Sequence, residues 1–300
     1  NLQVLRRLLA ERADVYHFHD PELLPIGLAL KVMRRRVVYD AHEHVRDDIR
    51  SKPYLGKVAR TVLLAGVGTL ERIVARTADA VIAATPTIAA QFPKGRTAVV
   101  HNYPMLEELP DGEFTYDEFE ARPRVGCYTG AMSPLRHADE MFAAADRVHA
   151  ELDEFRLVTA GAMYKVDDPA DHPGVDYRGI VDRTAVGDLL VESRFGVMLL
   201  ADAPNCADGL PTKFFEYAAS GLPVVVSRST HGIASIVDDV ECGYTVDETS
   251  PDAIADAMRK LLDAPADAYE MGQRGAKAMK AKYHWGNEAV TLLATYRGLS

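Results

Sequence analysis

The sequence predicts an α/β protein made of two successive Rossmann-like halves, each built on a parallel sheet. Short runs rich in Val and Ile alternate with longer segments of helical periodicity. This alternation is interrupted once, by an acidic stretch with Pro and Gly at 107–123. Strands that alternate with helices form parallel sheets through right-handed crossovers. A chain of 300 residues is long enough for two such domains.

The first half is expected to carry its polar groups where strands end. Its predicted strands are 14–18, 37–39, 80–84 and 98–100. Its predicted helices are 1–13, 23–33 and 55–77. His19 and His42 follow the first two strands, and the carboxyl ends of parallel strands are where open α/β sheets bind ligands.

The second half repeats the pattern after 107–123, which we interpret as an interdomain linker. Its predicted strands are 125–128, 156–159, 175–178, 196–200, 224–226 and 244–246. A helix is expected from Arg136, and Asp182 is expected to cap the N-terminus of another. The remaining predicted helices are 231–237, 251–262, 266–282 and 285–298.

Composition and charge exclude several classes of protein. The net charge of −10 argues against general nucleic-acid binding. It is uneven, because residues 1–110 hold 16 Lys and Arg against 12 Asp and Glu. This basic half suits contact with an anionic membrane surface, and an ordinary solvated surface fits as well. No apolar run reaches the roughly 18 residues of a membrane helix. Three cysteines without metal-ligand spacing fit a reducing cytosol.

The stretch 208–227 predicts a loop, a helix, a tight turn and a buried strand. Pro211 suits the first turn of the helix, and Gly221 suits the position just past its end. Lys213 falls in the first turn, where backbone N–H groups attract phosphate. Glu216 lies inside an apolar segment, which an ordinary crossover helix does not require.

This stretch resembles the signature of glycosyltransferase family 4, which has the GT-B fold. The signature is Glu, seven residues, Glu, a helix of small residues and then Gly-x-Pro-Val-Val. Glu216 matches the second Glu, and Asp208 stands at the first. The strings His-Asp-Pro-Glu-Leu-Leu (19–24) and Tyr-Asp-Ala-His-Glu (39–43) resemble first domains of the same family.

The resemblance implies two Rossmann-like domains facing a cleft. We expect an acceptor-side domain at 1–106, the linker at 107–123 and a donor-binding domain at 124–282. The helix at 283–300 is expected to return to the first domain. Family members normally begin with a strand and a Gly-rich loop, whereas the first element predicted here is a helix. The first domain is therefore expected to be incomplete.

The same resemblance implies the residues of the site. Arg136 and Lys213 would hold the donor diphosphate, Glu216 the ribose and Asp208 the sugar ring. The other donor-binding residues it implies are Gly130, Gly179, Ile180, Val181, Leu210, Pro211 and Thr212. On the acceptor side, His42, Asp20 and His19 would carry the chemistry. His17 and His44 are expected to be structural, turned away from His19 and His42 by strand alternation.

The function implied is that of a retaining glycosyltransferase, which moves a sugar from a nucleotide diphosphate sugar to an acceptor hydroxyl. The acceptor would be a polysaccharide, a glycolipid or a natural product, so the expected partners are the nucleotide sugar and a sugar or lipid-linked acceptor. No Asp-x-Asp pair occurs, so we expect no metal and no cofactor beyond the nucleotide sugar itself. We expect a cytoplasmic location, extending to the inner face of the membrane. Two alternatives stay open: a sugar-nucleotide 2-epimerase of the same fold, and a truncated protein that binds nucleotide without turnover.

Overall fold

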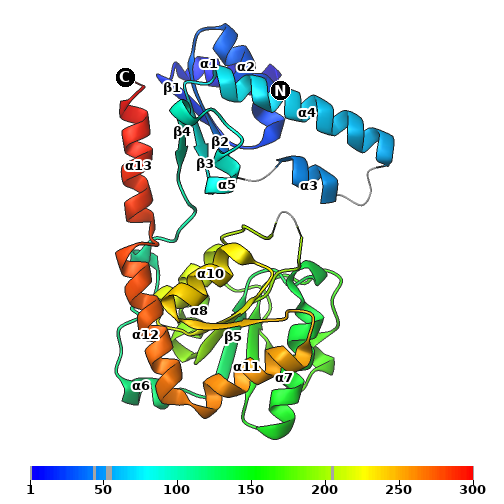
Figure 1. Cartoon of the computed structure of the whole chain (residues 1–300), viewed down its shortest axis with the longest axis vertical. Coiled ribbons are helices and arrows are strands. Elements are labelled where there is room, and N and C mark those ends of the chain that lie inside the picture. The colour runs from blue at the N-terminus through cyan, green and yellow to red at the C-terminus, as the bar shows by residue number, and fades with distance from the viewer. Residues whose placement is uncertain (1, 43–44, 52–55, 204–205, 300) are drawn as a thin grey trace. The chain divides into compact units, whose positions relative to one another are not determined.

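The computed structural model describes residues 2–42, 45–51, 56–203 and 206–299 (Figure 1). The chain divides into two compact units, of which the first comprises Asn1–Asn102 with Gly286–Ser300 and the second Tyr103–Trp285. Each strand expected from the sequence is present to within two residues. Each unit has its own parallel sheet, and the prediction of a two-domain α/β protein is therefore confirmed.

The sheet of the first unit runs in the order β1-β2-β3-β4 among the described residues. Its strands are β1 (Val15–Phe18), β2 (Arg36–Ala41), β3 (Ala80–Ala83) and β4 (Thr97–Val99). Its α-helices are α1 (Leu2–Glu11), α2 (Leu24–Val32), α3 (Val45–Ser51), α4 (Lys57–Thr77), α5 (Pro86–Ala89) and α13 (Trp285–Arg297). Leu30 of α2, Val74 of α4 and Tyr39 of β2 meet in one apolar core. The helix predicted at 55–77 begins at Lys57, and α3 was not predicted.

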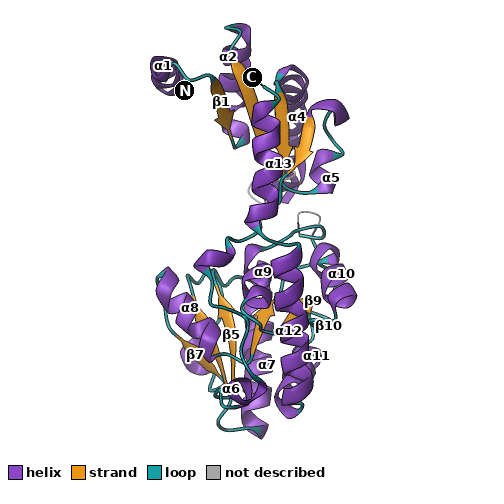
Figure 2. Ribbon diagram, turned by 90° about the vertical axis from the view of Figure 1, so that its left-hand side faces the viewer, coloured by secondary structure: helices purple, strands orange, loops and turns teal. Residues whose placement is uncertain are grey.

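The second unit is a doubly wound sheet with the order β10-β9-β8-β5-β6-β7. Its strands are β5 (Val125–Thr129), β6 (Arg156–Ala160), β7 (Val175–Tyr177), β8 (Phe195–Met198), β9 (Val224–Ser227) and β10 (Gly243–Val246). Its α-helices are α6 (Tyr116–Glu120), α7 (Ala138–Glu151), α8 (Arg183–Glu192), α9 (Thr212–Ala219), α10 (His231–Val240), α11 (Pro251–Asp263) and α12 (Pro265–Ala281). Figure 2 shows these helices flanking the sheet.

Two apolar cores cover the two faces of this sheet. One contains Phe142 of α7 and Ile254 of α11, and the other contains Phe214 of α9 and Ile233 of α10. Because both faces are covered, the central strand β9 is buried along its whole length and begins with three successive valines. Helices on both faces of a parallel sheet leave its strand ends as the place for ligands.

Three local expectations differ from the structure. The stretch 107–123 packs within the second unit, where Phe119 is fully buried and Tyr269 donates a hydrogen bond to the Phe114 carbonyl at 2.8 Å. Its helix α6 is only five residues long, too short to show helical periodicity. Arg136 ends a 3-10 turn, and α7 begins two residues later, after a left-handed residue. Pro211 occupies the N-cap of α9, one position before its first turn.

Candidate active site

The topology of the second unit creates a crevice at the ends of two neighbouring strands. β5 lies beside β8 in the sheet, yet the chain proceeds from β5 outward to β6 and from β8 outward to β9. The loops that leave these two strands therefore diverge, and such a switch point is where open α/β sheets bind ligands. Gly130 follows β5, and the segment 199–211 follows β8 and leads into α9.

Glycines lie directly after β5 and β6 and two residues after β7. Gly130, Gly161 and Gly179 all have positive φ, which side-chain-bearing residues rarely adopt. A Cβ on Gly161 would lie 2.1 Å from the Gly130 carbonyl oxygen, so there is no room for a side chain at position 161. Around Gly179 the space is open, with no atom within 4 Å of the Cβ position. A ligand could approach the backbone closely at that glycine.

Lys213 lies beside Gly130, at the start of α9. Its Nζ is 3.9 Å from the centroid of the Tyr128 ring and 3.0 Å from the Cβ position of Gly130. Burial, assisted by the positive charge of Arg136, lowers the pKa of Lys213 to about 7, while Glu216 acts in the opposite direction. Two cationic side chains that disfavour each other's charge are suited to an anion that carries several charges.

Glu216 is held by a residue that the sequence interpretation did not include. Its Oε1 accepts a hydrogen bond from Arg183 Nη1 at 2.6 Å, and the Glu216 side chain is only 12% exposed. Arg183 is the first residue of α8, directly after the N-cap Asp182, whose side chain accepts from Ala185 as predicted. The signal was available: Arg183 lies two residues after Gly179–Val181, which the resemblance had placed at the nucleotide.

The other donor-side residues line the approach to α9 or lie exposed. Asp208 is exposed on the turn that precedes Leu210. In this turn, the carbonyl oxygen of Ala207 accepts a hydrogen bond from the backbone N–H of Gly232 in α10. Leu210, Pro211 and Thr212 are partly buried and lead into the helix. Ile180 is 80% exposed. Val181 packs against the core that contains Phe214 of α9 and Ile233 of α10. The structure thus brings together Gly130, Arg136, Lys213 and Glu216, and leaves Asp208 and Ile180 open to solvent.

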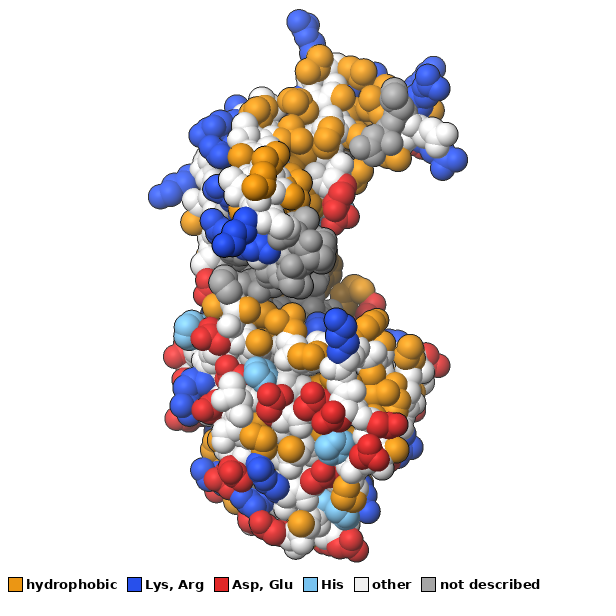
Figure 3. Space-filling model, turned by 90° about the vertical axis from the view of Figure 1, so that its right-hand side faces the viewer, with side chains coloured by type: hydrophobic (Ala, Val, Ile, Leu, Met, Phe, Trp, Pro, Cys, Tyr) orange, Lys and Arg blue, Asp and Glu red, His pale blue; other side chains and the backbone are white. Residues whose placement is uncertain are grey.

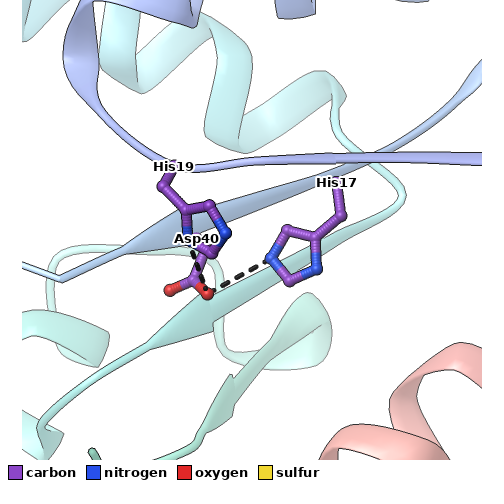
Figure 4. A group of neighbouring side chains, drawn as sticks. All are labelled: His17, His19 and Asp40. Carbon is purple, nitrogen blue, oxygen red and sulfur yellow. Dashed lines mark hydrogen bonds and ion pairs between the residues drawn. The ribbon is translucent and has the colours of Figure 1, made fainter.

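In the first unit, histidines gather around one carboxylate at the ends of β1 and β2 (Figure 4). Asp40 Oδ2 lies 3.2 Å from His17 Nε2 and 3.2 Å from His19 Nδ1. His19 Nδ1 is also 2.7 Å from His42 Nε2, and the two rings stack with centroids 4.8 Å apart. The Asp40 side chain is 10% exposed, whereas His19 and His42 are about half exposed. A nearly buried acceptor thus orients two imidazoles that solvent can reach.

A pocket of about 320 Å³ opens beside this cluster, lined by Asp20, Pro21, Glu22, Tyr39, Asp40, His42 and Val45. Asp20 has a φ of 65°, a strained conformation for a residue with a side chain. Two of the three residues expected to carry the chemistry, Asp20 and His42, therefore line one cavity. His19 borders it through its contact with His42.

The expectation that His17 faces away from His19 is wrong. Residues two apart in a strand lie on the same face, and the two rings stack with centroids 5.0 Å apart. The sequence interpretation also omitted Asp40 and Tyr296, whose Oη lies 2.5 Å from His17 Nδ1. Glu43 and His44 lie outside the described residues.

Comparison with known proteins agrees with this architecture. Residues 1–103 match the family model for a glycosyl transferase 4-like domain, and residues 123–264 match the model for glycosyl transferases group 1. A sucrose-phosphate synthase from Thermosynechococcus elongatus is 17% identical over 99% of this chain and 77% of its own, with a TM-score of 0.70. Anabaena HepE in complex with UDP is 13% identical over 99% of this chain and 81% of its own, with a TM-score of 0.73. The fold is therefore GT-B.

Curated relatives point to the same class. An MMP α-(1→4)-mannosyltransferase of Mycolicibacterium hassiacum is 23% identical over 99% of this chain and 74% of its own length. A GDP-mannose-dependent α-(1-6)-phosphatidylinositol monomannoside mannosyltransferase of Mycobacterium tuberculosis is 34% identical over 30% of this chain and 23% of its own. The chain belongs to the group 1 glycosyltransferases, the GT4-like enzymes of the GT-B fold. It is thus a glycosyltransferase of a family that uses nucleotide sugars.

Proposed function

We propose that this chain carries out retaining transfer of a hexose from a nucleoside diphosphate sugar to an acceptor hydroxyl, without a metal ion. The observation that carries the proposal is the convergence of Lys213, Gly130 and Glu216 at the switch point of the second sheet. A cation, a glycine without a side chain and a carboxylate are groups that suit a nucleoside diphosphate: the cation for phosphate, the glycine for close approach to the backbone and the carboxylate for the ribose hydroxyls.

Each group has a role in the proposed reaction. Arg136, Lys213 and the N-terminus of α9 stabilise the negative charge that develops on the departing diphosphate. Glu216 accepts hydrogen bonds from the ribose, because a carboxylate can accept two at once. Asp208, which is exposed on its turn, contacts the sugar ring. The backbone of Gly179, Ile180 and Val181 contacts the base.

On the acceptor side, we propose that His42, with His19 and Asp20, contacts the reacting groups. The Asp40 carboxylate lies 3.2 Å from His19 Nδ1 and 3.6 Å from His42 Nδ1, so its negative charge favours a proton on the imidazole nitrogens that face it. Imidazoles that solvent can reach are suited to exchanging a proton with an acceptor hydroxyl.

The names of the relatives direct the choice of donor. One is described as GDP-mannose-dependent, and two are described as making α linkages. GDP-mannose carries its mannose in α linkage, so an α product means that the configuration is retained. We therefore propose GDP-mannose as the first donor and inositol phosphates or mannosides as the first acceptors, since a D-inositol 3-phosphate glycosyltransferase is also among the relatives.

A calorimetric titration with GDP, UDP and ADP tests the donor site, with Glu216→Ala as its matched variant. Saturable binding of one nucleotide that Glu216→Ala weakens at least ~10-fold supports the proposal. No binding of any of the three would refute it. Nucleotide release that needs an acceptor supports transfer, release without one supports the epimerase, and binding without donor consumption supports a non-catalytic protein.

We also propose that the first unit contacts an anionic membrane surface. Figure 3 shows Lys and Arg side chains beside hydrophobic ones on this unit, whereas Asp and Glu side chains are frequent on the second. On α4, Val58 is 80% and Val62 67% exposed, one helical turn apart. None of the described helices has the length and hydropathy needed to cross a membrane. Sedimentation with vesicles of neutral and of anionic lipid tests this proposal, which fails if anionic vesicles do not pellet more of the chain than neutral ones.

A further inference from the structure

The histidine cluster of the first unit also has the composition of a metal site. His17, His19 and Asp40 each offer one ligand atom, and these atoms lie within 4.8 Å of one another (Figure 4). Imidazole and carboxylate are ligands that Zn²⁺ accepts in proteins. We propose that these three side chains bind a divalent transition-metal ion, for which Zn²⁺ is the probe.

Two of the three separations between the ligand atoms match those around a tetrahedral ion. Ligands about 2.0–2.1 Å from Zn²⁺ lie roughly 3.3 Å from each other in a tetrahedron. Asp40 Oδ2 lies 3.2 Å from both His17 Nε2 and His19 Nδ1. The parallel register pairs Phe18 with Tyr39, so the residues that follow them, His19 and Asp40, come side by side. His17 shares the face of His19, which makes the arrangement a property of two paired strands.

A partner outside the ligand set holds His17 in the orientation that a metal needs. Metal-binding histidines usually donate their second ring N–H to an oxygen, which selects the tautomer and fixes the ring. His17 Nδ1 lies 2.5 Å from Tyr296 Oη on α13. When Nδ1–H donates to this hydroxyl, the lone pair of Nε2 faces Asp40. Three protein ligands leave one position for water, and His19, at 52% exposed, lies on the solvent side.

His42 is not part of the proposed ligand set. Its Nε2 is 2.7 Å from His19 Nδ1, which is too short for two nitrogens bound to one tetrahedral ion. In the metal-free chain a proton shared between these nitrogens holds the pair together. Zn²⁺ takes the place of that proton on His19, so the ion and the His19–His42 hydrogen bond exclude each other. A bound ion would therefore break the hydrogen bond between the two histidines that are proposed to contact the acceptor.

The test is a calorimetric titration of the whole chain with ZnCl₂, after chelator treatment and removal of the chelator. We expect saturable binding that His17→Asn and Asp40→Asn each weaken at least ~10-fold. His231→Asn, which removes an exposed histidine of the second unit, should change the affinity less than ~2-fold. Co²⁺ should produce the visible absorption bands of a tetrahedral site. The proposal does not depend on transferase activity, because binding is the readout.

Three results would overturn it. The first is the absence of saturable Zn²⁺ binding. The second is binding that both cluster variants leave unchanged. The third is binding lost in His42→Asn but retained in His17→Asn, which would mean a different ligand set. Circular dichroism of each variant shows that it folds. Tyr296→Phe, which keeps all three ligands, should weaken Zn²⁺ binding ~10–100-fold, because it removes the oxygen that orients His17.

Discussion

The most direct prediction concerns the pH dependence of nucleotide binding through Lys213. Burial and the charge of Arg136 lower the pKa of this lysine to about 7 in the free chain. A bound diphosphate would raise that pKa again, because an anion stabilises the ammonium form. Binding should therefore take up a proton, and nucleotide affinity should fall as the pH rises above 7.

The size of the effect follows from the free-state pKa. With a pKa of about 7, half of the chains carry a protonated Lys213 at pH 7 and about 1% do at pH 9. If only the protonated form binds tightly, affinity should fall about 50-fold between these pH values, which corresponds to ~2.3 kcal/mol. At pH 8 close to one proton should be taken up for each nucleotide bound.

The assay is calorimetric titration of the nucleotide in two buffers with different ionisation enthalpies, at pH 7, 8 and 9. Lys213→Met should bind more weakly at pH 7 and lose most of the pH dependence. Lys277→Met, which removes an exposed lysine of α12, should keep it. An affinity that does not change from pH 7 to 9, or a Lys213→Met variant with the same slope as the parent, would refute the reasoning.

The same lysine should affect stability without ligand. Its pKa is lower in the folded chain than the ordinary 10.5, so between pH 7 and 10.5 the unfolded chain binds more protons and the free energy of unfolding rises with pH. Lys213→Met should raise the free energy of unfolding at pH 7, by at most about 5 kcal/mol. Urea denaturation of the whole chain and of this variant measures the difference.

Three further variants test individual contacts. Arg183→Ala should weaken nucleotide binding ~3–10-fold in calorimetry, because the guanidinium orients its carboxylate partner; tighter binding would mean instead that the arginine competes with the ribose. Tyr296→Phe removes one hydrogen bond to His17, which in turn contacts the Asp40 carboxylate beside His19 and His42. It should therefore lower kcat ~2–10-fold, shift the pH profile and leave the donor KM unchanged; an altered donor KM with normal kcat would contradict an indirect effect on these histidines. Tyr39→Phe should lower the free energy of unfolding by about 1–3 kcal/mol in urea denaturation, because the buried Tyr39 hydroxyl, whose pKa is raised by burial and by Glu71, donates a 2.9 Å hydrogen bond to that carboxylate; unchanged stability would show that Glu71 is satisfied without it.

Local rules were sufficient for the strands and for most helix ends. Gly221, expected just past the end of α9, has a φ of 72° after the C-cap Ser220, because only a residue without a Cβ adopts this conformation readily. The Val run of β9 is fully buried, as a central parallel strand requires. In such places one or two neighbouring residues determine the conformation, and the sequence alone predicts it.

Only the tertiary structure could decide which distant residues share a site. Glu216 and Arg183 lie on different helices, and His17 contacts Tyr296, which is 279 positions away in the sequence. No local pattern encodes these contacts, because they depend on strand order and on where α13 packs. Strand alternation, applied correctly, would have placed His17 beside His19. Asp40 joins them through the pairing of β1 with β2, and that pairing is a property of the folded sheet.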